Sequence, residues 1–284
     1  MTEFAYLDES LDINQTQSYH LSIQLGLNGL SFCILDTITN KYIALRHFPL
    51  TGDTDKQEYP DRFGKIVETD DFLRKSFKSS AVMVETFKST LVPAALFRKE
   101  EKDTYFTFSH ALEEDEVILT DKLSGTDAYC LYATPSDLLR FVEKYFSDAV
   151  TLHHTTPFIE GLFRNATSKG KEAAVHVLIH DTCFDIAVTR KQKLSLVNTY
   201  LYRQVNDMVY FILYIFQMLQ LDQQTVPIIL EGKINAQSSL IETLKRYVKN
   251  VSLVRRNSAF TYSYKLNVLP AHTFANLFNI YPCV

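Results

Sequence analysis

The sequence predicts an α/β protein made of two tandem subdomains, each a mixed sheet with a three-stranded antiparallel meander. Three consecutive segments of alternating apolar residues, at 19–50 and again at 173–202, are typical of neighbouring half-buried strands. Each trio is followed by alternating helical and strand-like segments, which favours parallel strands beyond the meander. The chain of 284 residues is also long enough for two domains of about 150 residues each.

The first predicted meander covers residues 19–27, 30–38 and 41–50. Asn28-Gly29 and Thr39-Asn40 separate these strands, and both pairs suit tight hairpin turns. We expect the polar segment 51–65 to be a loop that leads to a helix at 69–78. Pro93 suits the first turn of a helix and predicts one at 93–108. Further strands are expected at 81–87, 116–123, 127–133 and 149–156, with helices from Ser136 and over 157–166.

The second half repeats this order after the polar segment 167–172. Its predicted strands cover residues 173–180, 183–190, 193–202, 226–230 and 250–256, with helices at 204–221 and around 240–248. The run 208–219 is apolar except for Gln217. It is shorter than the ~20 residues of a membrane span, so we expect a helix buried against a sheet. The chain therefore divides into an N-terminal tail (1–18), a first subdomain with a connecting helix (19–170) and a second subdomain (171–284).

Composition and charge exclude several classes of function. The chain has 29 basic and 33 acidic residues, a net charge of −4 and no basic stripe, which argues against nucleic-acid binding. Its N-terminus is acidic and lacks the positive start of a signal peptide, so we expect a cytoplasmic protein without membrane insertion. The four cysteines are widely spaced and resemble no zinc module, so we expect reduced, buried thiols.

Two tandem units of this kind resemble the actin-like ATPase architecture, a duplicated ribonuclease-H-like fold, from about residue 19 to the C-terminus. The chain is also similar to an uncharacterised family of Bacteroidetes proteins, domain of unknown function 3822. The stretches that carry this second resemblance are TLVPAALF (90–97), NTYLYRQVNDMVYFILYIFQMLQL (198–221) and IILEGKI (228–234). The family name implies no activity. The actin-like resemblance implies a nucleotide held by two Asp-x-Gly loops, whose backbone N–H groups approach the phosphates, and by a Gly-Gly pair beside the adenosine.

Each of these three signatures is degraded here. In the first loop, Gln24-Leu25-Gly26 keeps the glycine but replaces the carboxylate with an amide that brings no charge for Mg²⁺. In the second loop, either His180 or Asp181 occupies the position of the acid, and no glycine is present. In the third signature Gly232 stands alone, and Lys233 takes the place of the second glycine. The degenerate cleft positions, which would bind a cofactor only if a nucleotide still enters, are Gln24, Gly26, His180, Asp181 and Gly232.

Other candidate sites have simpler structural interpretations. His180, Asp181 and Cys183 lie close in sequence, but neighbours on a strand point to opposite faces, so we expect a structural hairpin rather than a nucleophile with its base. His153 and His154 are adjacent and cannot easily chelate one ion, and the sequence offers no third ligand at suitable spacing. We therefore expect no catalytic residue, no metal site and no cofactor.

Three hypotheses of function follow. The leading one is a non-enzymatic actin-like pseudo-ATPase that serves as a protein-binding or assembly module, with a second copy of the chain as one candidate partner. The alternative is a divergent ATP-binding enzyme with the nucleotide between Gly26 and Gly232 and with Asp181 near the metal. Nuclease chemistry is the weakest, because it needs several carboxylates around two metals and the first strand offers Gln24.

Overall fold

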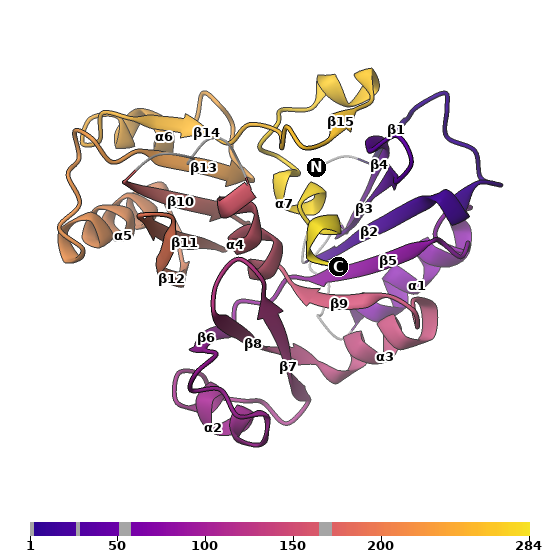
Figure 1. Cartoon of the computed structure of the whole chain (residues 1–284), viewed down its shortest axis with the longest axis horizontal. Coiled ribbons are helices and arrows are strands. Elements are labelled where there is room, and N and C mark those ends of the chain that lie inside the picture. Colours follow the sequence, from indigo (N-terminus) through magenta and orange to yellow (C-terminus); the bar gives the residue numbers. More distant parts are fainter. Residues whose placement is uncertain (1–2, 27–28, 51–57, 165–171) are drawn as a thin grey trace.

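The computed structural model describes residues 3–26, 29–50, 58–164 and 172–284, which form two lobes, each built on a mixed sheet (Figure 1). The first lobe contains a sheet with the strand order β1-β4-β3-β2-β5-β9, and β15 pairs with β4. The second contains a five-stranded sheet with the order β12-β11-β10-β13-β14. Within the described residues, no helix combines the length and the apolar character that a membrane span requires.

Both predicted meanders are confirmed. The meander of the first lobe consists of the antiparallel strands β2 (Tyr19–Gly26), β3 (Gly29–Asp36) and β4 (Lys41–Pro49). In the second lobe they are β10 (Ala173–Ile179), β11 (Cys183–Arg190) and β12 (Lys193–Leu201). Parallel strands extend each meander: β5 (Ser79–Val84) and β9 (Val150–His153) in the first lobe, β13 (Ile228–Gly232) and β14 (Val251–Leu253) in the second. The two lobes therefore repeat one topology.

A smaller sheet is inserted into the first lobe between β5 and β9. It consists of β6 (Ser89–Pro93), β7 (Glu116–Leu123) and β8 (Ala128–Pro135), in the order β6-β8-β7. The short helix α2 (Lys102–Thr107) covers it and buries Phe106 against Val92 and Leu131. Helix α3 (Ser136–Tyr145) returns the chain to the main sheet, where Phe141 packs on Phe63.

Two segments join the lobes. Helix α4 (Thr155–Arg164) follows β9 and packs Phe158 and Leu162 against Leu178 and Ala187 of the second sheet. After β14 the chain returns through β15 (Thr261–Tyr262) and α7 (Ala275–Phe278), which lies between the lobes (Figure 1). The C-terminal segment covers one face of the first sheet: Leu277, Phe278 and Ile280 pack with its buried side chains. The other face is covered by α1 (Tyr59–Thr69) and α3.

The ends of the predicted subdomains also contribute to the first sheet. Residues 4–7, in the predicted tail, form β1 (Phe4–Leu7), which pairs antiparallel with β4. Residues 261–262, in the predicted second subdomain, pair parallel with β4. The boundary at residue 170/171 lies outside the described residues, as do Asn28 of the first turn and residues 51–57 of the predicted loop.

Two predicted helices are misplaced. Residues 59–69 form α1, although 59–65 belong to the predicted loop, because Pro60 fits the first turn of the helix and Phe63 and Val67 face the core. The helix predicted at 69–78 is wrong, because the described chain forms turns after Asp70. The carboxylate of Asp70 accepts the backbone N–H groups of Phe72 and Leu73 and so fixes a turn there. Pro93 ends a strand instead of starting a helix, because β6 pairs with β8 through to that residue. The helix predicted at 93–108 is confirmed only in its second half, where α2 lies.

The apolar helix of the second lobe is α5 (Val205–Met218), and it packs against a sheet as predicted, but with one face only. Met208, Ile212, Ile215 and Phe216 are buried against the sheet. Tyr210 on the opposite face is 64% exposed, and Tyr214 and Met218 share that face. The helix therefore covers one side of its sheet, and no second layer of the described residues encloses it. Helix α6 (Ser239–Leu244) packs beside it.

Candidate functional site

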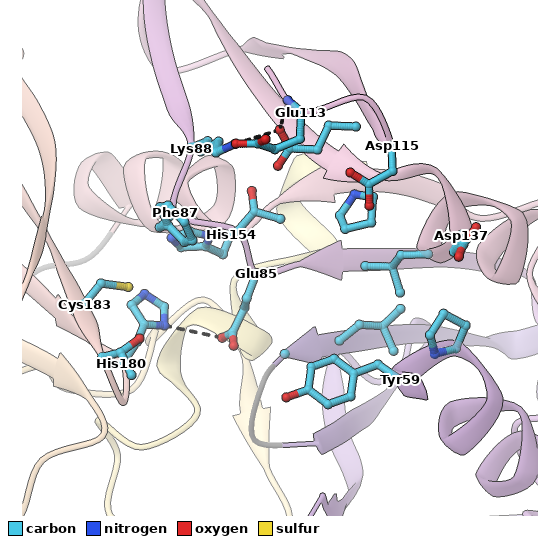
Figure 2. Close-up of a pocket in the computed structure, with 18 of the residues that line it drawn as sticks. Tyr59, Glu85, Phe87, Lys88, Glu113, Asp115, Asp137, His154, His180 and Cys183 are labelled. Atoms are coloured by element: carbon cyan, nitrogen blue, oxygen red, sulfur yellow. Dashed lines mark hydrogen bonds and ion pairs between the residues drawn. The ribbon is translucent and has the colours of Figure 1, made fainter. Parts of the chain in front are cut away.

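The hairpin of β2 and β3 in the first lobe and the hairpin of β10 and β11 in the second lobe point their ends toward each other. Gln24 and Gly26 come from the end of β2, and His180 follows β10. Glu85, which directly follows β5, lies between them. Its carboxylate accepts a hydrogen bond from Gln24 Nε2 (2.6 Å) and forms an ion pair with His180 Nδ1 (3.6 Å; Figure 2). A Cβ placed on Gly26 would collide with Glu85 Oε2, so the glycine is what lets this carboxylate lie against the backbone of the first loop.

Asp185 is the centre of the second half of this network. It lies in β11, fully buried, and its Oδ2 accepts hydrogen bonds from His180 Nε2 and His154 Nε2, both at 2.9 Å. Thr199 Oγ1 donates to the other oxygen, Oδ1, at 2.5 Å. His154 belongs to the first lobe, where it follows β9 and its backbone N–H donates to Val84. One carboxylate of the second lobe therefore holds an imidazole from each lobe.

Burial and charge set the protonation of this cluster. Burial lowers the pKa of His180, but the hydrogen bonds to Asp185 and Glu85 outweigh it and raise the pKa to about 10. Burial raises the pKa of Asp185, but attraction to His154 and His180 holds it well below its usual range. Burial likewise raises the pKa of Glu85, and His180 brings it below its ordinary value. At neutral pH the cluster thus contains an imidazolium between two carboxylates.

Asp181 and Gly232 lie beside this cluster. Asp181 forms an ion pair with Lys233, the residue that replaces the second glycine of the third signature. Gly232 has a φ of +88°, a conformation that favours glycine, and a Cβ there would collide with the carbonyl oxygen of Ile179. Position 232 therefore needs glycine because of its backbone conformation and its close approach to Ile179. Glu231, just before it, is buried, and burial raises its pKa to about 8.

The space between Gly26 and Gly232, where the resemblance implies a nucleotide, is small. Both glycines line one cavity of ≈ 70 Å³, together with Gln24 and His180. The C-terminal segment forms much of its wall, through Thr273, Phe274, Asn276 and Leu277. Cavities that bind small molecules have volumes of about 300–1,000 Å³. The structure thus brings four of the five predicted positions together, and Asp181 lies on the other side of His180.

A larger cavity of ≈ 470 Å³ opens on that other side (Figure 2). Tyr59 and Phe63 of α1, Leu138 of α3, Phe87 and the hairpin residues 180–183 form its walls. Six carboxylates and one ammonium group, that of Lys88, line the described part of the cavity; the acids are Glu85, Glu113, Asp115, Glu116, Asp137 and Asp181. Glu85, His180 and Gly26 line both cavities and so separate them.

The histidine, aspartate and cysteine of the second hairpin do not form a nucleophile with its base. Cys183 lines the larger cavity, but burial raises the pKa of its thiol to about 12, so it is protonated at neutral pH. The described residues contain four free cysteines and no disulfide.

Sequence reasoning missed three members of the cluster: Glu85, His154 and Asp185. Glu85 is the single acid in an apolar strand segment (AVMVETF), a signal that could have marked it. His154 has no further ligand at suitable spacing in the sequence, because its partners come from the other lobe. His154, His180 and Asp185 present ligand atoms within 4.8 Å of one another.

Comparison with known proteins agrees with this architecture. The model of a family described as "Protein of unknown function (DUF3822)" matches residues 8–251. A search of curated proteins finds no match.

Solved structures with the same fold are similar to this chain over nearly its whole length. A protein of unknown function with an actin-like ATPase fold from Bacteroides thetaiotaomicron has 21% identity and a TM-score of 0.83, with 96% of this chain and 99% of that chain covered. The PilM-PilN type IV pilus biogenesis complex gives 12% identity and a TM-score of 0.59, covering 92% and 96%. The ethanolamine utilization protein EutJ from Carboxydothermus hydrogenoformans gives 12% and 0.51, covering 96% and 91%. These likenesses show the actin-like ATPase fold.

Proposed function

The chain belongs to the DUF3822 family and has the actin-like ATPase fold, and we propose that it is a non-enzymatic pseudo-ATPase that acts as a protein-binding module. One observation carries this proposal: the cavity between Gly26 and Gly232 has a volume of ≈ 70 Å³. ATP does not fit in this space unless the C-terminal segment and the Glu85 carboxylate move away. The negative charge of Glu85 beside the first loop also disfavours phosphate there.

The larger cavity is the proposed binding surface. Its apolar walls are surrounded by six carboxylates against two cations, Lys88 and the His180 imidazolium, and Lys88 is itself paired with Glu113 and Glu116. Charge complementarity therefore favours a partner segment with apolar side chains and at least one Lys or Arg. PilM, a structural neighbour at a TM-score of 0.59, has been solved in a complex with PilN, which gives this fold a precedent as a partner-binding protein. The net negative charge and the free thiols favour a cytoplasmic protein that does not bind nucleic acid.

Thermal unfolding with and without millimolar ATP·Mg²⁺ tests the pseudo-ATPase. We expect an unchanged Tm. A ligand at 100 times its Kd stabilises the native state by about 2.7 kcal/mol, or several degrees for a chain of this size at about 2–4 °C per kcal/mol. A shift of that size would favour the alternative, a divergent ATP-binding enzyme, and the variant Asp181→Ala would then test whether this carboxylate lies near the metal of the bound nucleotide.

Site-specific photo-crosslinking in cells tests the protein-binding role. A photoreactive phenylalanine replaces Phe87, which lines the cavity, or Phe108, which is 93% exposed elsewhere on the surface. We expect a discrete crosslinked product from position 87 and none from position 108. Asp115→Asn should weaken the product, whereas Asp103→Asn on α2 should not. Equal products from both positions would contradict the proposed surface, and a product of twice the chain mass would identify a second copy as the partner.

A further inference from the structure

Beyond the proposed binding role, we infer that His154, His180 and Asp185 form a site for a divalent transition-metal ion of the zinc class that ties the two lobes together. The three ligand atoms converge from two lobes: His154 from the first, His180 and Asp185 from the second. Asp185 and His154 are buried, and His180 has 13% of its side chain exposed. This inference does not depend on whether a protein partner binds the larger cavity.

The spacing suits a single ion. Asp185 Oδ2 lies 2.9 Å from His154 Nε2 and 2.9 Å from His180 Nε2, and all three atoms lie within 4.8 Å. Ligands that share one Zn²⁺ at bonds of about 2.0–2.2 Å are themselves about 3–4 Å apart. An ion that binds here would displace the proton that His180 Nε2 shares with Asp185, and would draw the two imidazole rings toward the carboxylate.

The residue types select the metal. Two imidazoles and one carboxylate match Zn²⁺ and Fe²⁺, whereas Mg²⁺ and Ca²⁺ prefer oxygen ligands. This set therefore differs from the carboxylate and phosphate environment of the Mg²⁺ that accompanies a nucleotide. His154 and His180 also line the larger cavity, so a fourth coordination position can face that space.

Neighbouring side chains already orient the ligands. The carboxylate of Glu85 lies 3.6 Å from His180 Nδ1, the ring nitrogen that points away from the site, and Gln24 holds that carboxylate. Thr199 donates to the oxygen of Asp185 that the imidazoles leave free. Carboxylate–histidine–metal chains of this kind fix ring orientation in metal sites. His154 Nδ1 is buried without a hydrogen-bond partner among the described residues, so this ring is held by Asp185 and its packing alone.

Metal binding by tag-free protein, stripped with a chelator, tests the inference. We expect the wild type to bind one equivalent of Zn²⁺ in calorimetry with a rise in Tm, and to give visible d–d absorption with Co²⁺. His154→Gln should abolish all three signals. His110→Gln removes a histidine that bonds to Ser89 in the inserted sheet, away from the cluster, and should bind metal like the wild type.

Thr199→Val keeps the test decisive if His154→Gln does not fold. It removes only the outer hydrogen bond to Asp185 and should weaken Zn²⁺ binding by about 10–100-fold. Wild-type protein that binds no stoichiometric Zn²⁺, or binding that survives His154→Gln in a folded variant, would overturn the metal site and leave a hydrogen-bonded ion network in its place. Neither result bears on crosslinking at position 87, so the two proposals can fail separately.

Discussion

The two hairpins hold equivalent positions in the two lobes, yet they end in opposite ways. The first ends in Gly26, whose bare backbone admits a carboxylate from the neighbouring strand, Glu85. The second ends in His180, whose imidazolium is held by Asp185 of its own lobe. One lobe thus presents an anion and the other a cation, at the place where the resemblance implies phosphate groups. The lobes of this protein are therefore joined by their own charges.

The largest effect should come from Asp185→Asn, which removes the charge that both imidazoles share. Breaking a buried pair by removing one partner costs about 3–5 kcal/mol, because the other charge stays buried without compensation. At about 2–4 °C per kcal/mol, Tm should fall by roughly 6–20 °C. Differential scanning calorimetry measures this change. Asp181→Asn is the control in the same hairpin, and a fall as large as that of Asp185→Asn would show that burial in the network is not the cause.

Glu85 and Glu231 differ in whether a neighbouring cation compensates the charge of the carboxylate. Glu85 has a cationic partner, but Glu231 Oε2 has no hydrogen-bond partner in the described part of the chain, and burial raises its pKa from 4.5 to about 8. Between these two pH values the folded state holds a proton that the unfolded state has lost. The free energy of unfolding should therefore decrease as pH rises from about 5 to 8, by at most about 1.4 kcal/mol per pH unit from this group.

Glu231→Gln should remove that dependence, so the variant becomes more stable than the wild type as pH approaches 8. Urea unfolding at pH 5, 6, 7 and 8 measures it. Glu242→Gln, an exposed acid on α6, should leave the wild-type pH profile intact. Parallel profiles for the wild type and Glu231→Gln would contradict the raised pKa.

The architecture could be predicted from the sequence because it depends on local patterns. Alternating apolar residues and turn pairs are enough to identify both meanders, and the parallel strands follow from the order of elements. Helix α1 could not be placed, because its start at Tyr59–Pro60 lies in a polar stretch and Asp70 looks like a helix start rather than an end. The charged cluster could not be predicted for another reason. Glu85, His154 and Asp185 are far apart in sequence and come together only when the two lobes pack. Likewise, nothing local indicates that residues 273–277 fill the cleft.

Gly26 and Gly232 are required for different reasons. Gly232→Ala should destabilise the protein by about 1–3 kcal/mol, because its φ of +88° is strained for alanine and the new Cβ meets the backbone of Ile179. Gly26→Ala should cost less, because its Cβ meets the end of the Glu85 side chain, which can rotate away. The midpoint of urea unfolding measures both changes. A larger loss at Gly26 would mean that Glu85 is fixed more firmly than a side-chain end normally is.

The smallest effect is expected for Lys233→Met, which breaks the ion pair with Asp181. Both side chains are partly exposed, at 39% and 29%, and pairs of this kind contribute about 0–1 kcal/mol. The difference in unfolding free energy between wild type and variant should also shrink in 1 M NaCl, because salt screens exposed charges. A loss comparable to that of Asp185→Asn would mean that this ion pair within the second lobe, and not the buried network alone, fixes the hairpin that carries His180.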